Sequence, residues 1–76
     1  MNEKRRQNLR TALRMLSEAE SIVSTACDQE SDALENVPEN LQESDQYERA
    51  EQSAEHLDEA LDHISEAKEQ IESAIQ

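Results

Sequence analysis

Leu57–Ile75 reads LDEALDHISEAKEQIESAI, and its apolar residues recur every three or four positions. Leu57, Ile64 and Ile71 stand seven residues apart, and an alanine follows each of them three positions later. This spacing places large and small apolar side chains along one stripe of an α-helix. With Leu57 taken as position a of a heptad, the alanines occupy position d. The pattern predicts a helix that packs lengthwise against another helix.

The first half of the chain repeats the same heptad pattern. Leu9, Leu16 and Val23 occupy position a, and the alanines at d are Ala12, Ala19, Ala26 and Ala33. Two apolar repeats of similar length predict two helices, over about 3–36 and 45–75, within one domain of residues 1–76.

The segment between the repeats contains the only proline. Pro38 lacks a donor N–H and disfavours helical geometry at Val37, so the first helix should stop near Asn36. Pro38 also suits the start of a short helical turn that runs to Gln42. Ser44 or Asp45 then caps the second helix.

Equal helices joined by one short linker (about 37–44) predict an antiparallel two-helix coiled-coil hairpin with an alanine-rich seam. The facing residues are inferred from side-chain volume, because each layer packs evenly when a large residue meets an alanine. In this register Leu16 meets Ala67. Glu30 faces Ser53 in a polar layer near the loop, and Ala33 faces Ala50.

The composition excludes a β-sheet fold. The chain has no Gly, Phe or Trp, one Pro and one Tyr. Strands favour β-branched and aromatic residues, and tight hairpin turns favour glycine. An all-α fold is therefore expected.

The charge is acidic and unevenly distributed. Seven basic residues oppose 19 acidic ones, a net charge of −12, yet the first 14 residues are net basic. Phosphates would be repelled by most of the chain, so direct nucleic-acid binding is not expected. Arg6, Arg10 and Arg14 share one face at the start. They predict charge pairs with the end of the second helix (Glu66, Glu69 and Glu72), or alternatively a phosphate-binding arm.

The residues capable of chemistry do not form a recognisable site. His56 and His63 fall at position g, beside the predicted seam, and the chain contains no Glu-x-x-His of the kind that ferritin-like bundles use. Cys27 has no neighbouring base or cation to activate it. We therefore expect no catalytic, metal-binding or cofactor-binding residues, no cofactor and no enzymatic activity.

A single cysteine cannot form an internal disulfide, and no uninterrupted apolar stretch comes after the basic start. The sequence thus predicts a cytoplasmic protein with no membrane segment.

A second apolar stripe lies beside the seam at position e. In an antiparallel pair the e positions of both helices line the same side, and two helices alone leave this side uncovered. We therefore expect self-association into a dimeric four-helix bundle. The predicted dimer face comprises Leu13, Cys27, Leu34, Tyr47, Leu61 and Ile75.

The linker and the start of the second helix resemble a known family. Val37–Ser44 reads VPENLQES, and a Glu/Ala-rich segment beginning Tyr47-Glu48-Arg49-Ala50-Glu51 comes after it. These residues resemble small acidic helical proteins of uncharacterised function encoded by Firmicutes and their phages. The resemblance covers roughly the last forty residues. It implies a hairpin and a phage or mobile-element origin, and brings no active-site residue.

Two functions are consistent with these features. The first is a non-enzymatic module that engages itself and one protein partner through apolar helix faces. The alternative is an acidic mimic of nucleic acid that blocks a basic DNA- or RNA-binding surface. Its surface would be the acidic ridge, which comprises Glu48, Glu51, Glu55, Asp58, Asp62, Glu66 and Glu69.

Overall fold

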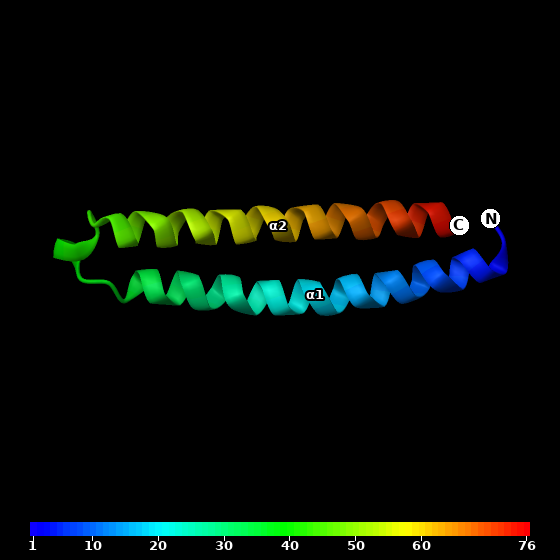
Figure 1. The fold of residues 1–76 in the computed structure, drawn as a ribbon, viewed down its shortest axis with the longest axis horizontal. Helices are drawn as coiled ribbons and strands as arrows, with labels where there is room; N and C mark the ends of the chain where they lie inside the picture. The colour runs from blue at the N-terminus through cyan, green and yellow to red at the C-terminus, as the bar shows by residue number, and fades with distance from the viewer.

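The computed structural model covers residues 1–76 and contains helices and no strands. Helix α1 spans Glu3–Glu35, a 3-10 turn η1 spans Glu39–Leu41, and helix α2 spans Asp45–Ile75. The two long helices run side by side in opposite directions, so both termini lie at one end and η1 at the other (Figure 1). The chain is a helical hairpin, and each helix begins and ends within one residue of its expected limits.

Each long helix begins at a polar cap. The Asn2 side chain accepts a hydrogen bond from the backbone N–H of Arg5 at 2.8 Å. The Ser44 hydroxyl accepts one from the N–H of Tyr47 at 3.2 Å. Such side chains satisfy N–H groups that have no partner within the first turn of the helix. Ser44, rather than Asp45, is therefore the cap of α2.

The loop turns without glycine. No residue of the chain has a positive φ angle. Asn36 caps the end of α1, and its N–H donates to the Leu34 carbonyl; Pro38 then takes an extended conformation that precedes η1. The Leu41 N–H donates to the Pro38 carbonyl at 2.9 Å. Because proline ends the first helix, no left-handed cap is needed there.

The hairpin is long and thin. Its extents are 59 × 15 × 13 Å and its radius of gyration is 17.3 Å, whereas a compact domain of this length has a radius of about 11 Å. None of the 76 residues is buried. The contact between the helices is therefore open to solvent along its whole length.

Partial burial matches the heptad frame. The apolar residues at positions a, d and e are half-buried in both helices, apart from Ala33 and Ala74, which are exposed. We expected Ala33 to face Ala50 within the seam, but only Ala50 is shielded. Of the predicted polar layer, Glu30 is half-buried and Ser53 is exposed. Ala33 and Ala74 lie in the last turns of their helices, where the other helix covers less of the surface.

Neither helix is long and apolar enough to cross a membrane.

Candidate functional site

Three contacts between the helices lie on one flank of the hairpin. The Cys27 thiol lies 3.9 Å from the carbonyl oxygen of Ala54, and the Lys68 ammonium donates to Glu20 at 3.2 Å. The Arg6 Nε donates to the carbonyl of Ile75 at 3.2 Å. In every case both residues occupy position e. The e positions of α1 and α2 therefore share one side, as the heptad frame predicts.

The predicted dimer face lies along this flank. All six of its residues are half-buried in the hairpin. They are partly covered by the opposite helix but not enclosed. This flank is thus the edge of the seam itself rather than a separate exposed stripe.

Charged residues divide the flank into two parts. Toward the termini it carries Arg6, Glu20 and Lys68, and the Glu20 and Lys68 side chains are 34% and 23% exposed. Toward the loop it carries Cys27, Ala54 and other apolar side chains. The flank thus has an apolar half toward the loop and a charged half, with both basic and acidic side chains, toward the termini.

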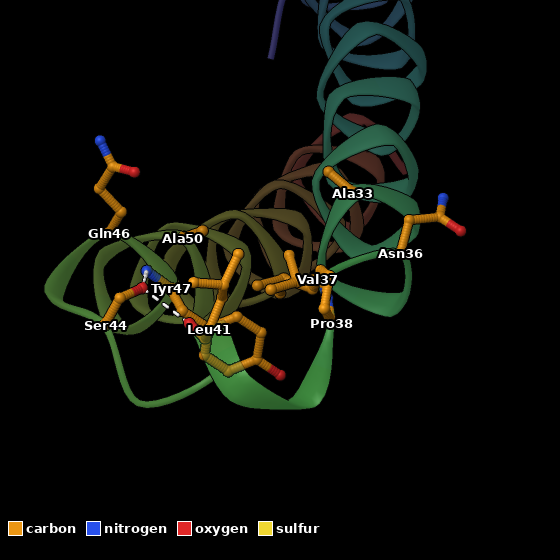
Figure 2. Close-up of a pocket in the computed structure, with 10 residues that line it drawn as sticks. Ala33, Asn36, Val37, Pro38, Leu41, Ser44, Gln46, Tyr47 and Ala50 are labelled. Atoms are coloured by element: carbon orange, nitrogen blue, oxygen red, sulfur yellow. Dashed lines mark hydrogen bonds between the residues drawn. The ribbon is translucent and has the colours of Figure 1, made fainter.

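The apolar half continues into a concave site at the loop end. This cavity has a volume of about 370 Å³ and is lined mainly by apolar side chains. Val37, Leu41 and Tyr47 point toward one another in Figure 2, whereas Asn36 and Gln46 point away. The full lining comprises Ala33, Leu34, Asn36, Val37, Pro38, Leu41, Ser44, Gln46, Tyr47 and Ala50.

Hydrogen bonds within the loop hold the walls of the cavity. The Ser44 hydroxyl donates to the Leu41 carbonyl at 2.8 Å while it caps α2 (Figure 2). The Gln42 side chain donates to the Val37 carbonyl at 3.3 Å. One serine thus fixes both the start of α2 and the position of Leu41. Tyr47 is the only titratable residue in the lining.

The acidic ridge lies on the outer side of α2. All seven of its residues are exposed. Only Glu66 has a basic neighbour within ion-pair distance, the ring of His63 at 3.9 Å. The remaining six carboxylates form no ion pair, so the negative charge of the ridge is not neutralised within the hairpin.

The basic start pairs differently from our expectation. Arg6 and Arg10 both contact Glu3 of their own helix, at 3.8 Å and 3.2 Å. Arg14 forms no ion pair, and none forms between these arginines and Glu66, Glu69 or Glu72. The predicted interhelical pairs are therefore wrong. The three glutamates occupy positions c, f and b, which point away from α1.

The histidines are exposed side chains at the edge of α2. No group of three or more His, Cys, Asp or Glu residues is arranged to hold a metal ion. Cys27 is a free, half-buried thiol.

Three exposed apolar side chains within the elements were not predicted from the sequence. Met15, Ile22 and Leu41 are 63%, 71% and 51% exposed. Met15 and Ile22 both occupy position g of α1, seven residues apart. That spacing is visible in the sequence, but position g lies outside the apolar stripes at a, d and e.

The chain matches no protein-family model, no curated protein and no solved structure.

Proposed function

We propose that this hairpin is a non-enzymatic interaction module that pairs with a second copy through its predicted dimer face and engages one protein partner. The observation that carries the proposal is the complete lack of buried residues in the single hairpin. Apolar burial is the main force that stabilises a fold. Because every apolar residue of the single hairpin remains partly accessible to solvent, apolar burial stabilises the hairpin less than it would a protein with a closed core.

The surface area supports the same proposal. The hairpin exposes 5908 Å², whereas a compact monomer of 8.7 kDa exposes about 4,700 Å². The excess is about 1,200 Å², and a stable interface needs roughly 800 Å² from each partner. A second hairpin laid along one flank would remove an area of this size.

The two halves of the e flank suit a second copy. The apolar half, which includes Cys27, Leu34, Tyr47 and Leu61, offers the side chains that a four-helix bundle encloses. The charged half carries Arg6, Glu20 and Lys68, so a second copy would meet charges of both signs. Like-charge repulsion would therefore not oppose pairing on this flank.

The character of the cavity supports a non-enzymatic role. Catalytic sites bring several polar or titratable groups together in a concave pocket. Here the concave site contributes one phenol among mostly apolar groups. Apolar concavities of this kind receive side chains in protein interfaces.

Light scattering after size-exclusion chromatography tests the proposal. At micromolar concentration the chain should have twice the monomer mass of 8.7 kDa. Leu61→Asp should halve that mass, because it places a charge in the proposed interface. Gln52→Asp adds the same charge at an exposed position of α2 and should leave the dimer intact. A wild-type monomer with full helicity by circular dichroism would contradict the proposal.

The second candidate function is mimicry of nucleic acid by the acidic ridge. Its support is the set of six exposed carboxylates that no cation in the chain pairs with. A mimic would capture a basic, nucleic-acid-binding partner and release it at moderate salt. Capture that survives high salt and is lost in Leu61→Asp favours the apolar module. The resemblance of the 37–44 linker adds the proposal of a phage or mobile-element origin, which the neighbouring genes would test.

A further inference from the structure

Met15 and Ile22 are the two most exposed large apolar side chains of the chain, at 63% and 71%. They stand seven residues apart on α1, about 10 Å along the axis. Isolated exposed apolar residues are ordinary on protein surfaces, whereas two on the same face two turns apart form a patch. This Met15–Ile22 patch is not part of the proposed dimer interface.

The patch lies on the flank opposite the predicted dimer face. The three interhelical contacts all join e positions, whereas Met15 and Ile22 occupy position g, on the other side of the seam. Every g residue of both helices is exposed. In the predicted seam register, which pairs Leu16 with Ala67, the nearest g residue across the seam is His63 for Ile22 and Gln70 for Met15. The g flank is therefore an open shelf formed by both helices.

Carboxylates at position c of both helices lie beside the g flank. Glu18 stands one turn from both Met15 and Ile22 and is exposed. On α2, Glu66 stands at position c, outward of the g flank; it lies 3.9 Å from the ring of His63, and its side chain is 73% exposed. The shelf thus combines two apolar anchors with carboxylates beside them.

The polar side chains at the two ends of the patch are already hydrogen-bonded. Thr11 and Thr25 stand one turn beyond Met15 and Ile22. Their hydroxyls donate to the carbonyls of Gln7 and Ser21 in the same helix, at 3.2 Å and 3.1 Å. Because these donors are already bonded, a partner could cover them without leaving an unpaired hydroxyl proton.

We infer that the g flank binds a basic amphipathic helix, whose apolar residues seat on Met15 and Ile22 and whose Lys or Arg side chains meet Glu18 and Glu66. This inference rests on the proposed interaction role and names the partner's chemistry. Two anchors two turns apart match the i and i+7 positions of a docked helix. Methionine suits such a surface because its side chain adapts to different shapes.

Charge distinguishes this partner from a second copy of the chain. Two copies paired through their g flanks would bring Glu18 and Glu66 of one against those of the other, which like-charge repulsion opposes. The e flank carries charges of both signs. The g flank carries one cation, Arg49, near the loop end, whereas the carboxylates of Glu18 and Glu66 lie beside the patch and favour a cationic partner there.

A designed peptide tests the inference on the full-length protein. The probe is a labelled helical peptide of leucine and lysine, with leucines three and four residues apart on one face. Its control has the same composition in scrambled order. Fluorescence polarisation should show tighter binding of the amphipathic peptide, and added NaCl should weaken it. Equal binding of both peptides would overturn the inference, because charge alone would then explain it.

The double variant Met15→Ser with Ile22→Ser should weaken binding of the amphipathic peptide roughly tenfold or more. The control Gln7→Ser with Gln52→Ser introduces the same two serines at exposed helix positions outside the patch and should leave affinity within about twofold. Equal losses in the two variants, or none in the variant of Met15 and Ile22, would overturn the inference.

Light scattering separates this inference from the proposed dimer. The double variant should keep wild-type mass and helicity, and a lower mass would identify the patch as the self-association surface and overturn the inference. A wild-type monomer that still binds the peptide through Met15 and Ile22 would contradict the dimer and leave the inference standing.

Discussion

The guanidinium Nε of Arg6 lies 3.2 Å from the carbonyl oxygen of Ile75, so the start of α1 contacts the last turn of α2. The final carbonyls of a helix have no partner within it and carry partial negative charge. A cation at this point satisfies a carbonyl and opposes that charge. Arg6 thereby ties the two ends of the chain together.

Arg6→Gln should therefore loosen the end of α2. Loss of the cation should cost about 0.5 kcal/mol, because the side chain is partly exposed and such contacts are modest. Hydrogen exchange at residues 71–75 should accelerate more than elsewhere in the chain. Arg10→Gln removes an equal charge, but Arg10 contacts only Glu3 of its own helix. Equal acceleration in both variants would mean that Arg6 acts through net charge alone.

The heptad frame carried the information that fixes the hairpin. Large residues at a with alanines at d predict two helices, and Pro38 predicts where the first one ends. The heptad repeat is periodic and the effect of proline is local, so both can be recognised without knowing how the chain folds. The choice between Ser44 and Asp45 as the cap depended on backbone geometry that spacing alone does not decide.

The sequence was less informative about the flanks. The partners of Arg6 and Arg10 depend on how far a long side chain reaches, and Glu3 lies nearer than any carboxylate of α2. Met15 and Ile22 were not predicted, because position g is not part of the apolar stripes at a, d and e. The signal that could have found them is their apolar character at a position that the heptad pattern does not bury. Surfaces that contact nothing within the chain leave no packing constraint from which to predict them.

The predicted register can be tested by cross-linking. The contacts of Arg6 with Ile75 and of Cys27 with Ala54 agree in register and place Leu16 level with Ser65, in the turn that contains Ala67. In a Cys27→Ser background, Leu16→Cys with Ala67→Cys should oxidise to a disulfide within one chain, since bridged Cα atoms must lie within about 7 Å. Mass spectrometry of the non-reduced digest identifies the linked peptides.

The matched control is Leu16→Cys with Ala60→Cys in the same background. Residue 60 lies one heptad from residue 67, about 10 Å along the axis. It should not form the disulfide within a chain. Preferential closure of this control pair would show that the helices are shifted by one heptad.

Ser44→Ala should destabilise the hairpin by about 1 kcal/mol, because it removes the cap of α2. The same hydroxyl donates to Leu41, so the loop loses a second hydrogen bond. For a chain of this size the melting temperature should fall by about 4–8 °C at fixed protein concentration. Ser53→Ala is the control, because Ser53 is exposed within α2 and alanine favours a helix interior. A loss as large in the control would rule out capping as the cause.

Sodium chloride should raise the thermal stability of the chain. With a net charge of −12 and six ridge carboxylates outside any ion pair, folding brings like charges together along α2. Salt screens this repulsion over about 10 Å at 0.1 M, so the melting temperature should climb between low and moderate NaCl.

The triple variant Glu51→Gln, Glu55→Gln and Asp58→Asn removes three of these charges. It should melt at a higher temperature in low salt and respond less to added NaCl. A general effect of salt on apolar burial would act on the variant and the wild type alike. An identical salt response in the two proteins would therefore show that repulsion within the ridge is not the cause.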